Sequence, residues 1–245
     1  MPTYRGPGGL YEDDPEIMSL LSAEGLARHP ERLWRHLDDM RVKAAAAEPN
    51  AAHRILARWE REKRFGRFLI ATQNVDGLHQ RAGSDRVAEL HGSLWQMARP
   101  RTVEYADDEA FSQDAQDMMG AKNRASILRR WSEENHQTVW EDRTVPFASI
   151  PPYSDPDIRP NIVLFNEGYG NRLLWVDDFI RQAPDLVLVI GCSGGVSLLD
   201  RLLRSCRQAN PACAILNLNP HEDAVRMEHA YWAAGAVEGL QNLII

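Results

Sequence analysis

One short stretch of the chain concentrates polar side chains of the kinds that bind ligands and move protons. It runs from Thr72 to Gly92 and follows an apolar, strand-like segment, Phe68-Leu69-Ile70-Ala71. Among the polar side chains of the stretch are the amides Gln73 and Asn74, the carboxylate Asp76 and the imidazoles His79 and His91. Open α/β sheets carry their ligand chemistry at the carboxyl ends of their strands, so this stretch is the first candidate for a functional site.

His91 is the strongest candidate for acid–base chemistry. It follows a short predicted strand, Val87 to Leu90, and precedes Gly92. An imidazole titrates near neutral pH, so this side chain could act as a general base. A lone histidine is also often a structural residue that bonds a carbonyl group, and the residue type alone does not separate the two roles.

Asn74 and Asp76 stand two positions apart at the end of the first predicted strand. On extended backbone, residues at this spacing point to the same side. A ligand between them would meet an amide and a carboxylate together. The alternative is an Asx turn that closes the strand.

A second candidate is the glycine-rich run Gly191-Cys192-Ser193-Gly194-Gly195, which joins a predicted strand, Asp185 to Ile190, to a predicted helix, Leu198 to Gln208. Such a loop lets backbone N–H groups approach a phosphate or a ribose. Many α/β crossovers carry glycines there, so the run is weak as a signal. Asn217, in the predicted strand Ala214 to Leu218, could likewise be a simple strand terminator.

Continuous apolar strands that alternate with helices predict the fold class. This pattern favours an α/β, Rossmann-like fold with a mainly parallel sheet and helices on both faces. Residues 98–157 differ in composition and are helix-prone, so we predict a small inserted helical module. The main domain would then comprise residues 1–97 and 158–245. Its strands are predicted at Arg67 to Asn74, Val87 to Leu90, Asn161 to Phe165, Asp185 to Ile190 and Ala214 to Leu218.

Composition narrows the class of partner. The 245 residues carry a net charge of −7, which argues against unspecific binding to nucleic acid. No apolar run approaches the roughly 18 residues of a membrane span, and no signal peptide is evident, so no membrane partner is expected. Cys192, Cys206 and Cys213 form no regular framework and suit a reducing cytoplasm.

The order Gln73-Asn74-Val75-Asp76, followed by Leu90-His91-Gly92, closely resembles the signature of the sirtuins, the NAD-dependent protein deacylases. The resemblance covers most of the chain. It implies NAD as cofactor and an acyl-lysine protein or peptide as substrate, with nicotinamide and O-acyl-ADP-ribose as products. The matching histidine in sirtuins takes a proton from the nicotinamide ribose so that a peptidyl-imidate forms. The catalytic residues implied are His91, Asn74 and Asp76.

The resemblance also assigns cofactor contacts. Gln73 and Asn74 would meet the ribose and an ordered water, and Asp76 would hold the nicotinamide carboxamide. The N-terminal segment resembles the loop that folds over NAD, with Tyr4 shielding the reactive ribose carbon and Arg5 contacting the cofactor. The remaining cofactor contacts that the resemblance implies are Gly191, Cys192, Ser193, Asn217 and Gly235.

Residues 159–167 resemble the strand that pairs with the acyl-lysine peptide through its backbone. Val163 and Phe165 would line the acyl-lysine tunnel. Asn166 stands where the family usually has glycine, and a side chain there would obstruct the incoming peptide backbone.

Three features depart from the family pattern. The Gly-Ala-Gly-x-Ser loop and its central strand are absent from the 245 residues, so these residues alone are expected to bind NAD weakly, and an upstream start of translation is favoured. Between Leu94 and Asn161 there is no cysteine and only His136, so no metal is expected. Leu37 and Met40 replace the tyrosine and arginine of desuccinylating sirtuins, which disfavours an acidic acyl group.

These departures leave three functions open. The leading prediction is an NAD-dependent protein lysine deacylase. An NAD glycohydrolase or ADP-ribosyltransferase would use the same nicotinamide pocket without a peptide tunnel, and Asn166 favours it. The third is a truncated, non-catalytic homologue, which the absence of the Gly-Ala-Gly-x-Ser loop from the 245 residues favours.

Overall fold

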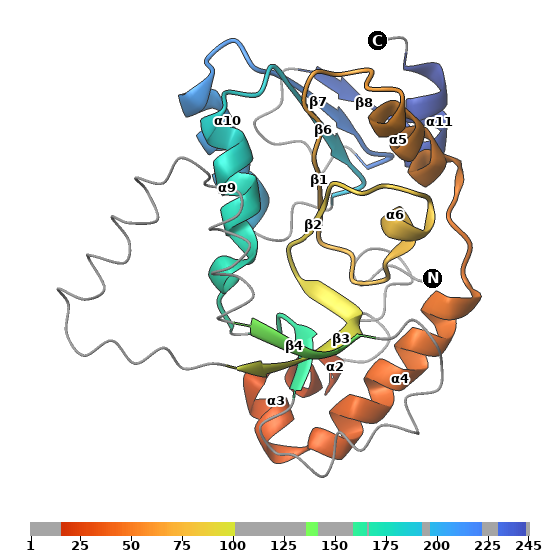
Figure 1. The fold of residues 1–245 in the computed structure, drawn as a ribbon, viewed down its shortest axis with the longest axis vertical. Coiled ribbons are helices and arrows are strands. Elements are labelled where there is room, and N and C mark those ends of the chain that lie inside the picture. Colours follow the sequence, from red (N-terminus) through yellow and green to blue (C-terminus); the bar gives the residue numbers. More distant parts are fainter. Residues whose placement is uncertain are drawn as a thin grey trace, which may run out of the picture.

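The computed structural model describes residues 16–100, 136–141, 159–165, 167–192, 197–221 and 230–243 (Figure 1). The helices are α2 (Glu16–Leu20), α3 (Ala23–Arg28), α4 (Pro30–Ala46), α5 (Ala51–Arg61), α6 (Leu78–Arg81), the 3-10 helix η2 (Gly170–Leu173), α9 (Leu174–Arg181), α10 (Ser197–Ala209) and α11 (Ala236–Asn242). The strands are β1 (Ile70–Thr72), β2 (Val87–Glu89), β3 (Gly92–Pro100), β4 (His136–Glu141), β5 (Arg159–Ile162), β6 (Leu186–Ile190), β7 (Ala214–Leu218) and β8 (Ala230–Trp232).

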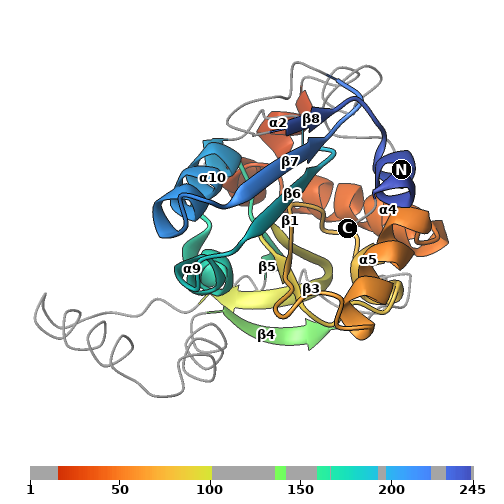
Figure 2. The same ribbon diagram turned by 90° about the horizontal axis from the view of Figure 1, so that it is seen from above.

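The strands form parallel sheets in one part of the molecule and an antiparallel sheet in the other. β1 pairs parallel with β2, and β6, β7 and β8 form a second parallel sheet in that order. Within the described residues the two parallel sheets share no ladder, although β1 lies beside β6 (Figures 1 and 2) and Ile70 packs with Leu188 and Ile190 of β6. β3 pairs antiparallel with both β4 and β5. The parallel strands and flanking helices agree with the predicted α/β class.

Four predicted strands extend beyond the observed ones, of which Val87 to Leu90 and Asp185 to Ile190 do so by a single residue. β1 ends at Thr72, because the Thr72 hydroxyl accepts the N–H of Asn74 at 3.1 Å and turns the chain out of the ladder. β5 ends at Ile162, and the backbone beyond it pairs with other segments. In the predicted helical insert, the described residues 136–141 form β4, a strand, so helix was wrong for these residues. The rest of the insert beyond Pro100 and before Arg159 lies outside the described residues.

Helix α4 packs against the antiparallel sheet. Pro30 stands at its first turn, where a missing N–H costs nothing. Its buried residues recur at helical spacing and pack against β3 and the segment after β5. They are Leu33, Leu37, Met40 and Ala44, and their partners include Leu94, Trp95, Ile162 and Leu164.

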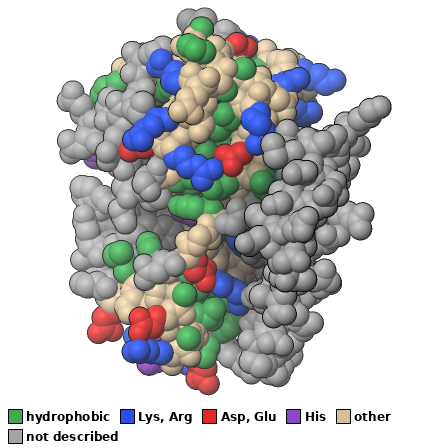
Figure 3. All heavy atoms as spheres, turned by 90° about the vertical axis from the view of Figure 1, so that its left-hand side faces the viewer, with side chains coloured by type: hydrophobic (Ala, Val, Ile, Leu, Met, Phe, Trp, Pro, Cys, Tyr) green, Lys and Arg blue, Asp and Glu red, His purple; other side chains and the backbone are tan. Residues whose placement is uncertain are grey.

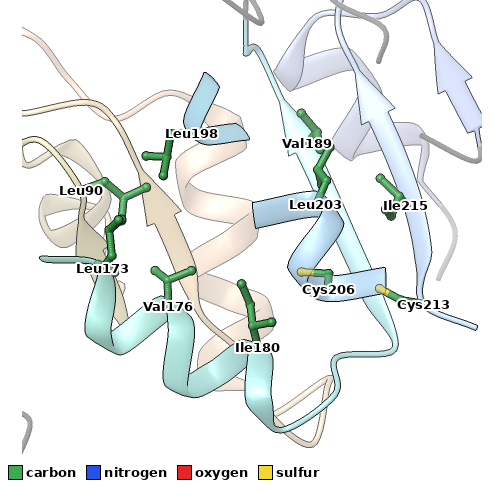
Figure 4. Packing of buried hydrophobic residues seen from close by; sticks show 11 residues of the cluster. Leu90, Leu173, Val176, Ile180, Val189, Leu198, Leu203, Cys206, Cys213 and Ile215 are labelled. Carbon is green, nitrogen blue, oxygen red and sulfur yellow. The ribbon is translucent and has the colours of Figure 1, made fainter. Parts of the chain in front are cut away.

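A second hydrophobic cluster connects the parallel sheets to α9 and α10. Leu173, Val176 and Ile180 project from η2 and α9 toward this cluster (Figure 4). Leu90, the residue just before His91, packs in the same cluster and is 2% exposed. The apolar core therefore fixes the backbone that carries His91. No described helix has the length and hydropathy that a membrane crossing requires.

Candidate active site

The predicted site residues gather where strands end. Gln73, Asn74 and Asp76 follow β1, and His91 follows β2 with one residue between. Gly191 and Cys192 follow β6, and Gly235 precedes α11, close after β8. Because the strands of each sheet are parallel, these groups stand at the carboxyl edges of the two sheets. Four predicted residues lie outside the described part of the chain, namely Tyr4, Arg5, Asn166 and Ser193.

Gly92 permits the sharp turn that presents His91. Its φ is +80°, and a Cβ at this position would lie 1.9 Å from the carbonyl oxygen of Asn161. Only glycine accommodates both this backbone conformation and this close approach. The carbonyl of His91 accepts the N–H of Val163 at 2.9 Å, so the segment after β5 lies directly against the turn.

The imidazole of His91 is partly buried and has two protein partners. The backbone of Gln73 forms a hydrogen bond with the ring, and Nε2 lies 3.3 Å from the hydroxyl oxygen of Tyr169. The rings of His91 and Tyr169 stack, with centroids 5.5 Å apart and 21° between their planes. Burial lowers the pKa of His91, the Gln73 backbone opposes this shift, and the charge of Arg172 adds to it. The ring is therefore neutral at pH 7, as a general base must be.

Asp76 anchors the loop between β1 and α6. One carboxylate oxygen accepts the N–H of Leu78 at 2.9 Å and so closes an Asx turn just before the short helix. The carbonyl of Asp76 accepts the indole N–H of Trp95 at 2.7 Å, and the neighbouring Val75 carbonyl accepts the N–H of Leu94 at 2.9 Å. The Asp76 side chain therefore closes a turn, as the alternative interpretation predicted. The same contacts hold its carboxylate in a fixed position.

Two histidines near Asp76 contact each other. His53 and His79 have ring centroids 4.7 Å apart. His53 also completes a capping box with Asn50 at the start of α5, with Nδ1 2.8 Å from the Asn50 oxygen. Burial, then the charge of His53, lowers the pKa of His79 to about 4, while Asp76 opposes the shift. His79 is therefore neutral through the physiological range.

The glycine-rich run begins with a left-handed residue, Gly191, with φ +63°. Its N–H donates to the carbonyl of Leu218 at 3.0 Å, and the Asn219 amide donates to the carbonyl of Cys192 at 2.7 Å. Asn217, the predicted ribose contact, is 0% exposed inside β7. Asn219, just beyond the end of β7, is buried as well at 4% exposed, so the ribose contact at Asn217 stays a prediction.

The predicted peptide-binding segment is already partly paired within the protein. The N–H of Phe165 donates to Leu21 at 2.7 Å, and its carbonyl accepts the N–H of Ala23 at 3.3 Å. Beyond it, both oxygens of Glu167 accept hydrogen bonds from Arg159, at 2.6 and 2.8 Å. Phe165 belongs to the cluster over α4, whereas Val163 lies against His91.

The structure adds three site residues that the sequence reasoning missed. They are Tyr169 and Arg172, which face His91 from η2 and the loop before it, and Asn219 in the loop after β7. Arg172 donates to Asn161, whose amide in turn donates to Gln96 at 2.7 Å. Burial lowers the pKa of this guanidinium to about 10, so it remains charged at pH 7. Their signal in the sequence was only a polar loop after an apolar strand.

Among the described residues, no three His, Cys, Asp or Glu side chains are grouped so that they could hold a metal ion. The region offers a partly buried imidazole, a carboxylate held by hydrogen bonds and open space beside Gly191 and Gly235.

The match to a family model decides what kind of site this is. The model described as the Sir2 family matches residues 1–197. This chain belongs to the Sir2 family. The predicted resemblance to sirtuins is thereby confirmed.

Two bacterial relatives of this Sir2 protein match nearly the whole chain. An NAD-dependent protein deacylase of Aquifex aeolicus is 30% identical over 248 residues, which cover 99% of this chain and 87% of the relative. NAD-dependent protein deacylase 2 of Corynebacterium efficiens is 30% identical over 248 residues and is covered to 85%.

Solved Sir2 structures share its fold. A mutant Sir2 homologue in complex with ADP-ribose superimposes with a TM-score of 0.72 at 26% identity, covering 98% of this chain and 82% of that one. A Sir2 homologue bound to NAD gives a TM-score of 0.68 at 26% identity and is covered to 80%. The predicted Rossmann-like α/β fold is confirmed by these likenesses.

Proposed function

We propose that this Sir2 protein is an NAD-dependent protein lysine deacylase that releases nicotinamide and an O-acyl-ADP-ribose. The observation that carries the proposal is the His91 ring, which is neutral, partly buried and held by the Gln73 backbone at the carboxyl edge of the β1–β2 sheet. Relatives named NAD-dependent protein deacylases that match nearly the whole chain support it.

The described residues fit NAD. At Gly191 and Gly235, added Cβ atoms would meet nothing within 4 Å, so there is open space at the ends of β6 and β8. Backbone N–H groups at such strand ends can face a phosphate. We keep Asn217 as the adenosine ribose contact that the resemblance to sirtuins implies, with Asn219 holding the neighbouring Cys192 carbonyl. NAD would supply the electrophilic ribose carbon and nicotinamide as the leaving group.

The residues of the chain then have distinct tasks. Asp76, fixed by Leu78 and Trp95, would orient the nicotinamide carboxamide, and Gln73 and Asn74 would face the ribose. His91 would accept a proton from a ribose hydroxyl. Val163 would contact the acyl-lysine, since its N–H donates to the His91 carbonyl and Val163 therefore lies beside this turn.

The test of this proposal is nicotinamide release, measured with and without an acetyl-lysine peptide. Release only with peptide supports a deacylase. Release without it indicates an NAD glycohydrolase, which the internal pairing of Phe165 favours because one edge of the peptide-binding segment is occupied. No release under either condition would indicate a non-catalytic homologue.

His91→Ala is expected to lower peptide-dependent turnover by about 10²–10⁴-fold, the usual contribution of a general base. The thermal midpoint should change little, because Leu90 and Gly92, not the imidazole, hold the turn. A variant with near-wild-type deacylation would contradict the assignment.

Partners and location follow as part of the proposal. Figure 3 shows Lys and Arg interspersed with Asp and Glu over the side of the molecule that carries α9 and α10. Arg201 pairs with Asp177 there at 3.0 Å, and Arg181 pairs with Asp178 at 3.2 Å. This mixed surface suits an acyl-lysine protein partner better than nucleic acid. The described cysteines are free, which suits the cytoplasm that we propose as the location.

A further inference from the structure

We propose that Tyr169 relays a proton from the substrate to His91. The inference rests on the proposed deacylase function and adds a catalytic residue to it. Tyr169 stands in the loop after β5, four residues beyond Phe165, and the turn after β2 presents His91 to it. The two side chains are 78 positions apart in the sequence and meet only in the fold.

The contact between them covers the nitrogen that a base would use. Tyr169 Oη lies 3.3 Å from His91 Nε2, and the two rings stack with 21° between their planes. The relay requires the neutral tautomer of His91 that is protonated at Nδ1, because Nε2 then has a lone pair that accepts from the phenol. A ring N–H that donates to the Gln73 backbone is consistent with this tautomer, since this hydrogen bond raises the pKa of His91.

The phenol is suited to stay protonated. Burial raises the pKa of Tyr169, so it is a donor across the working range of pH. The charged groups around the pair come from η2, from β5 and from the loop after β5. Arg172 disfavours a proton on His91, while Glu167 and Arg159 form their own ion pair behind it. The distance of 3.3 Å is long for a phenol, and catalytic hydrogen bonds commonly shorten when substrate binds.

The relay balances without any further reactant. A ribose hydroxyl gives its proton to Tyr169 Oη, while the Tyr169 O–H bond breaks and its proton forms an N–H bond at His91 Nε2. The products are the ribose alkoxide, a neutral tyrosine and an imidazolium. Gly168 and Gly170 flank Tyr169 and leave its backbone free to shift by the small amount required.

Tyr169→Phe tests the relay because it keeps the stacked ring and removes only the hydroxyl. Tyr231→Phe, which removes a hydroxyl from β8, is the matched control. We expect Tyr169→Phe to lower kcat for peptide-dependent nicotinamide release by about 10²-fold, with the KM for peptide unchanged, and Tyr231→Phe to leave both unchanged. A Tyr169→Phe variant at the wild-type rate, or faster, would overturn the relay.

A second readout needs neither NAD nor turnover. The phenol donates only to the neutral imidazole, so its loss should raise the pKa of His91 in an NMR titration of the NAD-free protein. An unchanged His91 pKa in Tyr169→Phe would overturn the hydrogen bond on which the relay depends. If the wild type releases no nicotinamide while this pKa still rises, the failure lies in the proposed function and the His91–Tyr169 contact stands.

Discussion

At the scale of the residue, Gly92 shows how one position constrains the turn that carries His91. Gly92→Ala would be destabilised in two ways. The alanine would have an unfavourable φ of +80°, and its Cβ would lie 1.9 Å from the Asn161 carbonyl oxygen. Gly83→Ala separates them, since Gly83 has φ +95° but open space around its Cβ. We expect Gly83→Ala to cost about 1–2 kcal/mol of unfolding free energy, the usual penalty of a left-handed alanine. Gly92→Ala should cost more than this and should also displace His91 and lower turnover. Urea denaturation measures both costs, and equal losses would show that the close approach is not rigid.

At the scale of the element, the histidine pair between α5 and α6 makes stability depend on pH. The pKa of His79 is about 4 in the folded state and near 6.5 when unfolded. Between these values the unfolded chain binds more protons, so stability should fall as pH drops from about 6.5 toward 4. His79→Gln should make this slope shallower by up to about 1.4 kcal/mol per pH unit, whereas His29→Gln, at an exposed position, should not. Denaturation curves from pH 7.5 to 5 test the difference. Equal slopes in wild type and His79→Gln would contradict the assigned pKa.

At the scale of the whole molecule, Trp95 joins the part built on α4 to the loop that carries Asp76. Its indole donates to the Asp76 carbonyl at 2.7 Å, and the Arg41 guanidinium lies 5.2 Å from its ring centroid. Trp95→Phe keeps an aromatic ring but leaves the carbonyl without this donor, so it should cost about 1–3 kcal/mol and weaken nicotinamide binding. Trp59→Phe, in the cluster around Ile70, should lower stability without weakening nicotinamide binding. Titration calorimetry with nicotinamide distinguishes them, and equal affinities would show that Asp76 is positioned without Trp95.

Local sequence by itself determined the family, the α/β class and the order of the candidate site residues. Gln73, Asn74, Asp76 and His91 lie within one short run, so their order could be read directly from the sequence. Apolar strands such as Leu186–Ile190 carry their own signal, because a parallel strand buried on both faces must be apolar throughout. Helix α4 is equally legible, since its buried residues recur at helical spacing.

Only the tertiary structure shows which residues from distant positions in the sequence lie side by side. Nothing local distinguishes Tyr169 or Arg172 from other loop residues, because their roles depend on which turn they face. Strand ends were misjudged for the same reason, as at Thr72, where a side chain competes with the ladder. The burial of Asn217 likewise depends on strands β6 and β8 on either side of β7. Propensity and spacing act along the chain, whereas burial and hydrogen bonding across the fold are set by segments that meet only when it is packed.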